Sequence, residues 1–153
     1  MTTPFPAPAL ENREAGAWLA GILPRAFAVF LVLHGLAHAI GFTVPWGLGG
    51  PRGVGYSTLI LNGSIDIGDT AVKAMSFLWL AAVFAFGLAG VMVWRGHRWA
   101  RRTTIAVVVG SLVLCAIRVP GSVIGLVIDV VLLALLAVVP DRLIVRPSSR
   151  ADG

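Results

Sequence analysis

Apolar residues occur along this chain in four long runs, which short polar or glycine-rich segments separate. A helix needs roughly 20 mostly apolar residues to cross the hydrocarbon core of a bilayer. The four runs reach or approach that length and predict transmembrane helices over residues 24–44, 71–94, 103–119 and 121–140. The sequence therefore predicts an all-α membrane protein, a four-transmembrane-helix bundle that forms a single membrane domain over residues 1–153.

Two segments outside these runs have patterns of their own. Residues 9–23 carry apolar and charged side chains on opposite faces, which predicts an N-terminal interfacial helix with Trp18 at the level of the lipid headgroups. Residues 45–70 form the outer loop, in which Asn62 and Gly63 between β-branched or apolar neighbours predict a small β-hairpin with a type I′ turn. Because an isolated hairpin is marginally stable in water, we expect it to lie on the outer ends of the helices as a lid.

Composition supports a membrane protein and excludes several other classes. Hydrophobic residues make up 58% of the chain and charged residues 12%, whereas soluble domains have roughly 25% charged residues. Disorder and an ordinary soluble core are therefore excluded. The single cysteine, Cys115, cannot form an internal disulfide or a cysteine-based zinc site.

Basic residues are distributed unequally between the two sides of this four-span plan. The net charge is +5, but the basic residues lie between the apolar runs, which is typical of membrane orientation and not of a nucleic-acid interface. One side holds nine: Arg13, Arg25, Arg95, Arg98, Arg101, Arg102, Arg142, Arg146 and Arg150. The other side holds three: Arg52, Lys73 and Arg118. The predicted location is the cell inner membrane, with both termini in the cytoplasm and the lipid bilayer as the main partner.

Ionisable residues within the predicted spans are the first candidates for function, because polar groups are expensive in hydrocarbon. His34 and His38 lie one helical turn apart on the same face of the first span, and Asp129 lies near the middle of the fourth. With a rise of about 1.5 Å per residue, His34 lies roughly 13 Å and His38 roughly 19 Å from the cytoplasmic start. Counted from the outer side, Asp129 is level with His38, so the two are expected to interact. Arg118, nearer the outer surface, and a serine or threonine hydroxyl are the other possible partners of Asp129. Alternatively, Asp129 is protonated in its low-dielectric surroundings.

These residues fit three kinds of site. As candidate catalytic residues, His34, His38 and Asp129 are acid/base groups or members of a proton relay. As structural residues, they form hydrogen bonds between helices. Two histidines at this spacing can also bind zinc together, but they cannot be the two opposite axial ligands of one haem. The sequence requires no metal or cofactor, and it leaves haem, quinone and zinc open.

Two further acidic residues precede the second span. Asp69 is expected to cap that helix, and Asp66 to lie on the hairpin. Alternatively, the two acids and Arg118 line the mouth of a ligand pocket.

The first span resembles the opening helix of DoxX-like small membrane proteins. The shared pattern is an arginine, an apolar stretch, a His-Gly pair and a Gly-Phe pair: Arg25, His34-Gly35 and Gly41-Phe42. The chain departs from that pattern because it lacks the lysine usual after His-Gly and has His38 nearby instead. More widely, the chain resembles four-span membrane proteins of an actinobacterial type to which no activity is assigned, through Tyr56-Ser-Thr, Asp66-x-Gly-Asp69 and Gly125-Leu-Val-Ile-Asp129. The DoxX resemblance implies the four-helix plan and an association with quinone or thiol redox chemistry.

Three functions are compatible with this sequence. The first is a non-enzymatic role, as an accessory subunit of another membrane protein or as a bundle that binds a lipophilic small molecule. The second is a membrane redox or acid/base enzyme that acts on a quinone-like or isoprenoid-like substrate through His34, His38 and Asp129. The third, a small transporter, is disfavoured because the chain lacks internal repeats.

Overall fold

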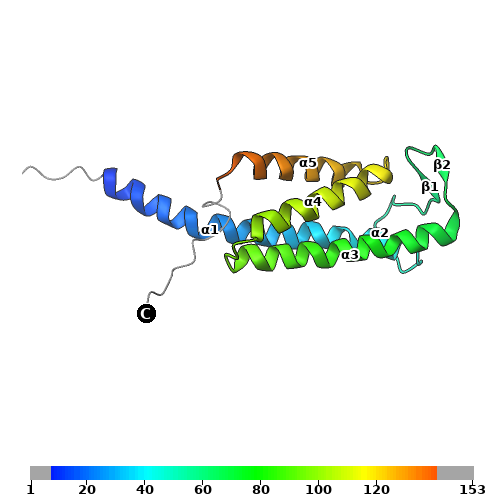
Figure 1. Ribbon diagram of the computed structural model, residues 1–153, viewed down its shortest axis with the longest axis horizontal. Helices are drawn as coiled ribbons and strands as arrows, with labels where there is room; N and C mark the ends of the chain where they lie inside the picture. Colours follow the sequence, from blue (N-terminus) through cyan, green and yellow to red (C-terminus); the bar gives the residue numbers. More distant parts are fainter. Residues whose placement is uncertain (1–7, 141–153) are drawn as a thin grey trace, which may run out of the picture.

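The computed structural model describes residues 8–140, which are mostly helical. Figure 1 shows long helices that run side by side, with a small hairpin at one end of the bundle. The elements in chain order are α1 (Pro8–Ala37), α2 (Ala39–Thr43), β1 (Leu59–Ile60), β2 (Ile65–Asp66), α3 (Gly68–Trp94), α4 (Ala100–Ile117) and α5 (Val123–Val138).

Three helical stretches are long and apolar enough to cross a membrane: Gly21–Thr43, Gly68–Trp94 and Ala100–Ile117. The predicted helix over 121–140 is present as α5, but it has 16 residues and is shorter than these three. The four predicted helices are therefore confirmed as helices, and three of them have the length of a membrane span.

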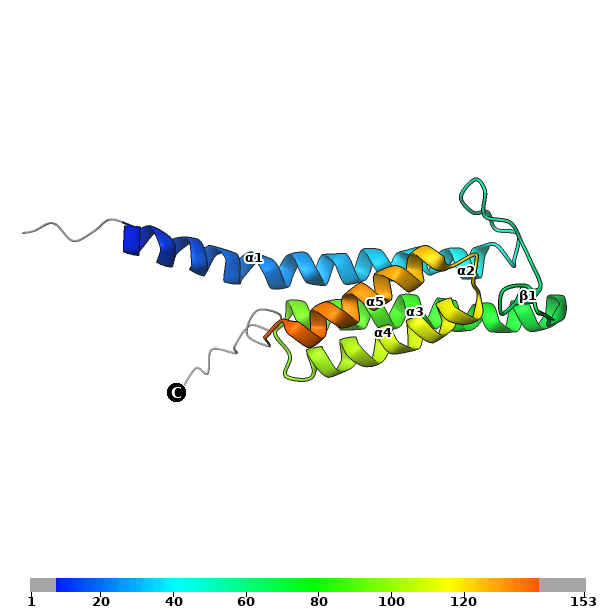
Figure 2. The ribbon, with the colours of Figure 1, turned by 90° about the horizontal axis from the view of Figure 1, so that it is seen from above.

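The N-terminal segment differs from the prediction. Residues 9–23 do not form a separate helix, because α1 continues from Pro8 to Ala37 with Pro24 inside it. A change in composition marks a change in the surroundings of a helix, and it does not by itself end the backbone hydrogen bonds. Proline removes one of these bonds in a helix interior, yet here the helix continues past it. The first part of α1 extends beyond the ends of the other helices (Figure 2).

The first span is interrupted near the end that leads to residues 45–70, where α1 stops at Ala37 and α2 starts at Ala39. The amide of His38 donates to the carbonyl of Gly35 at 3.0 Å, and not to the carbonyl of His34 four residues back. This tighter turn leaves the carbonyl of His34 without its usual amide partner, and the consequence appears in the site described below.

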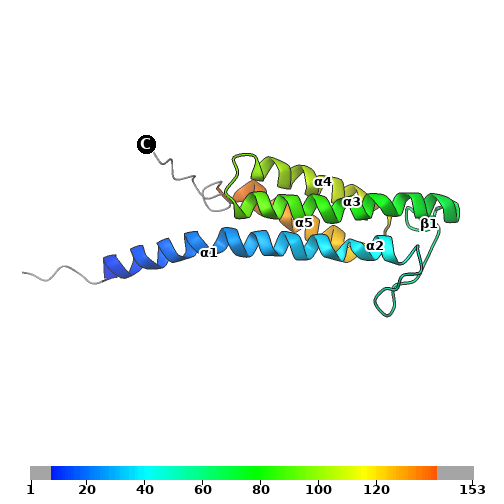
Figure 3. The same cartoon turned by 90° about the horizontal axis from the view of Figure 1, so that it is seen from below.

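Small residues bring α1 and α3 close together, and Figure 3 shows these two helices lying alongside each other. A Cβ atom added to Gly35 would lie 2.5 Å from the Cβ of Phe86, and one added to Gly90 would lie 2.9 Å from the carbonyl oxygen of Ala28. Helix α4 packs against both α3 and α5. The buried core lies among these helices and includes Leu31 and Leu132.

The predicted hairpin is present, but its strands are shorter than expected. Residues 59–60 pair with residues 65–66, so four residues connect the strands. Asn62 and Gly63 both have positive φ, 58° and 83°, as the predicted type I′ turn requires. Leu61 also has a positive φ of 50°, so three successive residues of the four-residue connection have positive φ.

The hairpin is attached to the end of the bundle at which α4 and α5 are connected. The amides of Leu61 and Asn62 donate to the carbonyls of Ile117 and Val119, at 2.9 and 3.0 Å. These carbonyls belong to the end of α4 and to the turn that leads to α5. Backbone hydrogen bonds therefore hold the tip of the hairpin against the α4–α5 turn.

Candidate functional site

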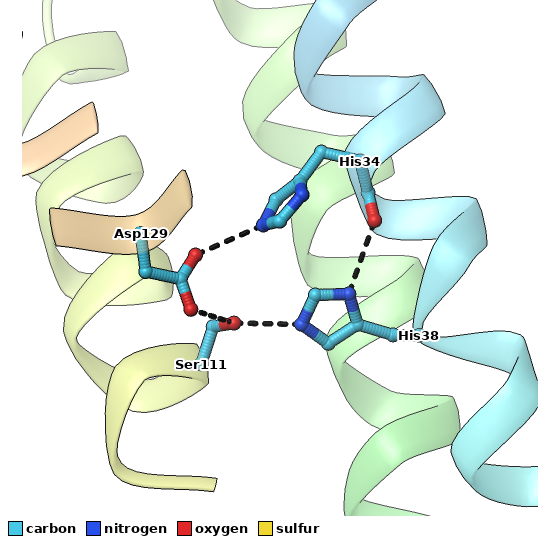
Figure 4. A network of polar contacts seen from close by, with 4 residues as sticks. All are labelled: His34, His38, Ser111 and Asp129. Atoms are coloured by element: carbon cyan, nitrogen blue, oxygen red, sulfur yellow. Dashed lines mark hydrogen bonds and ion pairs between the residues drawn. The ribbon is translucent and has the colours of Figure 1, made fainter. Parts of the chain in front are cut away.

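A buried group of four polar side chains joins three helices near the middle of the bundle. Figure 4 shows His34 and His38 from the first span, Ser111 from α4 and Asp129 from α5 pointing toward one another. All four residues are at most 6% exposed. We call these four residues the polar cluster.

Asp129 binds directly to His34. The Nε2 atom of His34 lies 2.9 Å from Oδ1 of Asp129, and the two side chains are 4% and 0% exposed. The sequence predicts that Asp129 interacts with His38, one turn further along the helix. The direct partner is His34 instead, and His38 interacts with Asp129 through the hydroxyl of Ser111. The sequence gives the depth of the histidines from one end of the bundle and the depth of Asp129 from the other. An error in the length of a predicted span therefore shifts the depth of Asp129 relative to those of the histidines. An error of about 5.4 Å, one helical turn, is enough to exchange the partner.

Ser111 connects Asp129 to His38. Its hydroxyl oxygen lies 2.6 Å from Nε2 of His38 and 2.6 Å from Oδ2 of Asp129. Sequence reasoning did not identify Ser111, although a serine inside an apolar helix is a recognised residue for hydrogen bonds between helices. The signal was present, but many such serines bond only to their own helix.

The second ring nitrogen of His38 supplies a hydrogen bond to the backbone carbonyl that is left unpaired at the interruption between α1 and α2. Nδ1 of His38 lies 3.0 Å from the carbonyl oxygen of His34, the group that the turn leaves without an amide donor. A carbonyl oxygen only accepts hydrogen bonds, so Nδ1 carries the proton in this contact. The backbone therefore determines which ring nitrogen of His38 is protonated.

Aromatic side chains hold both imidazole rings in place. The ring of Phe86 lies with its centroid 4.9 Å from that of His34 and 5.2 Å from that of His38. Trp79 contacts His38 with a centroid separation of 5.4 Å, and Phe30 is parallel to His34 at 6.1 Å. Such packing restricts the rings to one orientation, and it places the polar cluster among apolar neighbours.

A cavity of about 330 Å³ extends from the two histidines toward the outer loop. Its walls are mostly apolar and include Met75 and Trp79 of α3, whereas Arg118 lines it from the α4–α5 turn. This volume lies within the range of about 300–1,000 Å³ typical of small-molecule sites. The cavity thus combines apolar walls with imidazole groups and a guanidinium group.

Arg118 does not bind Asp129. Its Nη1 donates to the carbonyl oxygens of Ser57 and Leu59, at 3.0 and 3.3 Å, and so ties the start of the hairpin to the α4–α5 turn. Burial lowers the pKa of Arg118 from its usual value, but an arginine remains charged at neutral pH. Arg118 is therefore both a wall of the cavity and a support of the hairpin.

Asp66 lies on the hairpin as predicted, at the end of β2, and Asp69 lies in the first turn of α3. Neither residue lines this cavity. Asp69 does not cap the helix: it accepts a hydrogen bond from the Tyr56 hydroxyl and forms an ion pair with Lys73 at 2.9 Å. Asp66 instead accepts the hydrogen bond of the Gly68 amide, the first residue of α3, at 3.0 Å. Hydrogen bonds from Thr58 and from this amide lower the pKa of Asp66. Both acids are explained by local structure.

The chemistry of a metal site fits the polar cluster less well than hydrogen bonding does. Ligand atoms of His34, His38 and Asp129 lie within 4.8 Å of one another. Two ligands on one zinc ion, each at about 2.1 Å, are separated by at most about 4.2 Å. Moreover, each of these atoms is already at hydrogen-bond distance from a partner. As built, the cluster is a hydrogen-bond network.

We compared the chain with protein-family models, curated proteins and solved structures, and nothing matches it. The resemblance to DoxX-like proteins stays a prediction. The functional proposal therefore depends on the polar cluster and the adjoining cavity.

Proposed function

We propose that this protein is a multi-pass protein of the cell inner membrane that binds a lipophilic small molecule in the cavity next to His34 and His38. The observation that carries the proposal is the cavity itself, which has mostly apolar walls and a few polar groups among them. An apolar molecule with one polar group matches that lining, because its body is removed from water while its polar group finds a hydrogen-bond partner.

The outer surface of the helices supports a location in lipid. Large apolar side chains are exposed on several helices, among them Leu33 at 60%, Phe84 at 70%, Ile124 at 79% and Val138 at 82%. Exposed apolar side chains in such number are costly in water but match a bilayer. Together with the three helices of spanning length, it favours a bundle whose outside contacts lipid and whose polar groups lie inside.

The distribution of basic residues supports the orientation with both termini in the cytoplasm. Single cysteines at the exposed positions Arg52 and Arg98, which lie at opposite ends of the bundle, test it. We expect an impermeant thiol reagent to label Arg52→Cys in intact cells and Arg98→Cys only after the cells are opened. The native Cys115 is buried and should stay unlabelled. Labelling of Arg98→Cys in intact cells would reverse the proposed orientation.

Binding is tested with purified protein in lipid nanodiscs, with 1-naphthol and 1-methoxynaphthalene as lipophilic probes. Saturable binding, after subtraction of the probe taken up by empty nanodiscs, is the expected result. The variant Ala37→Phe places a large ring in the cavity wall and should weaken binding at least tenfold. The matched control is Ala106→Phe, because Ala106 is an exposed α4 residue outside the cavity and should leave binding unchanged.

If neither probe binds saturably, or if both variants bind like the unmodified protein, ligand binding in the cavity is refuted. The accessory-subunit role would then be the better explanation of the fold.

A second candidate function is an acid/base enzyme acting on a quinone-like or isoprenoid-like substrate. The specific observation in its favour is the contact between His34 and Asp129, since a carboxylate that holds one ring nitrogen orients the imidazole as a base. In this role His34 exchanges a proton with the substrate, whereas Asp129, Ser111 and His38 position it. Turnover of a bound molecule, lost in His34→Gln and retained in the exposed His97→Gln, would favour the enzyme over simple binding.

A further inference from the structure

We infer that the polar cluster keeps Nδ1 of His34 free of a proton, so that the cavity selects ligands whose polar group is a hydroxyl over otherwise similar carbonyl or ether compounds. The inference rests on the proposed function and specifies its ligand class. A quinol, a phenol or an isoprenoid alcohol belongs to the favoured class, whereas a quinone or a methyl ether does not.

The first step concerns Ser111, which has one hydroxyl proton and two close neighbours. Nε2 of His38 and Oδ2 of Asp129 each lie 2.6 Å from its oxygen, so that each contact needs one proton. If Ser111 donates to Asp129, Nε2 of His38 must supply the other proton. If Ser111 donates to His38, Oδ2 of Asp129 must supply it. Because Nδ1 of His38 is already protonated, the first arrangement pairs a charged His38 with a charged Asp129, and the second leaves both neutral.

The second step concerns the remaining oxygen of Asp129, which faces His34. In both arrangements Oδ1 carries no proton, and at 2.9 Å it accepts one from Nε2 of His34. In the opposite hydrogen bond, a protonated Oδ1 of Asp129 would donate to Nε2 of His34. Oδ2 would then carry no proton and Ser111 would donate to it, so that His38 would have to be doubly protonated beside a neutral Asp129. That leaves an uncompensated positive charge among buried groups, which is strongly unfavourable. Nε2 of His34 therefore carries the proton.

The third step concerns the other ring nitrogen of His34. A neutral imidazole with a proton on Nε2 has a lone pair and no proton on Nδ1. Among residues 8–140, Nδ1 of His34 has no hydrogen-bond partner, and within the same part of the chain every fully buried polar side-chain atom has one. Nδ1 of His34 is therefore accessible, and His34 lines the cavity. Of the four imidazole nitrogens in the polar cluster, it is the acceptor left for a ligand.

The fourth step is the consequence for selectivity. A hydroxyl group donates to Nδ1, whereas a carbonyl or an ether oxygen has no proton to donate and would place its own lone pairs against the ring. A site built to hydrogen-bond one polar group discriminates against the analogue that lacks it. We expect a preference of about tenfold or more for the hydroxyl compound, the factor that corresponds to about 1.4 kcal/mol.

The protonation pattern is measurable without any ligand. The chain contains three histidines, so ¹⁵N labelling of histidine gives few signals, which His34→Gln and His97→Gln assign. The expected spectrum shows a protonated Nε2 and a bare Nδ1 for His34, and a protonated Nδ1 for His38. A proton on Nδ1 of His34 would overturn the inference, whatever the outcome of the binding experiments.

The ligand preference is measured with 1-naphthol and its methyl ether, 1-methoxynaphthalene, in nanodiscs. We expect the unmodified protein and the control His97→Gln to bind 1-naphthol at least tenfold more tightly. In His34→Gln the side-chain amide still donates to Asp129 but offers no ring nitrogen, so the preference should fall to near unity. Equal binding of the two probes to the unmodified protein, or a full preference retained in His34→Gln, would overturn the inference and leave the proposed function intact. Failure of both probes to bind would refute the proposed function itself.

Discussion

The hydroxyl of Ser111 is the smallest group whose removal should disconnect the polar cluster. It bridges His38 and Asp129 with two contacts of 2.6 Å, and the residue is 2% exposed. Replacement by alanine removes one oxygen atom and keeps the helix, so the change acts on hydrogen bonding and hardly on packing. In Ser111→Ala, Nε2 of His38 and Oδ2 of Asp129 both lose a partner.

The expected cost follows from those two groups. A buried polar group left without a partner destabilises the folded state by about 1–3 kcal/mol, so two of them cost about 2–6 kcal/mol. Alanine is a better helix former than serine, which offsets roughly 0.5 kcal/mol of this destabilisation. We therefore expect Ser111→Ala to lower the free energy of unfolding by about 1.5–5.5 kcal/mol.

The assay is reversible unfolding in detergent, followed by the loss of helical signal. Thr104→Val is the matched control, because Thr104 is a fully buried hydroxyl residue on the same helix. Its hydroxyl donates only to the carbonyl of Ala100, one turn back in α4, at 2.8 Å. Its removal leaves no group between helices unpaired, so the cost should stay below about 1 kcal/mol. Equal destabilisation by the two substitutions would refute a connecting role for Ser111.

Further substitutions at Asp129, Gly35 and Gly63 test other parts of the structure by the same unfolding measurement. Asp129→Asn should cost less than about 1.5 kcal/mol, because the amide oxygen can accept from His34 while the NH₂ group donates to Ser111. Asp129→Leu, which can do neither, should cost about 3–5 kcal/mol. Similar costs for the two variants would show that the hydrogen bond from His34 to residue 129 is unimportant for stability. Gly35→Ala should destabilise the protein by about 1–3 kcal/mol, because the new Cβ would lie 2.5 Å from the Cβ of Phe86. The control Gly110→Ala, in open space on α4, should stabilise it by up to about 1 kcal/mol. A change in stability of the same sign in both variants would contradict close packing of α1 on α3. Gly63→Val forces a β-branched residue to a φ of 83° and should cost about 1–2 kcal/mol or more, so an unchanged midpoint would be evidence against the turn.

The positions of the helices could be predicted because they depend on local composition. A long apolar run with few charges indicates a helix of spanning length, whatever its neighbours are. The Asn62-Gly63 turn has the same local origin, since positive φ at two successive residues is rarely available to other pairs. His34, His38 and Asp129, which lie well inside the apolar runs, are also identifiable as candidates from their surroundings in the chain alone.

The partners within the site were decided by the tertiary structure. Whether Asp129 meets His34 or His38 depends on the relative height of α1 and α5, and a shift of one turn exchanges the two histidines. Ser111 joins the polar cluster because α4 presents it between these helices. Its place inside an apolar run marks it as a possible bridge between helices, but does not identify its partners. Likewise, the cavity beside the polar cluster depends on how complete helices fit together. Apolar runs specify which segments enter the bundle, whereas the contacts between helices specify which polar groups meet inside it.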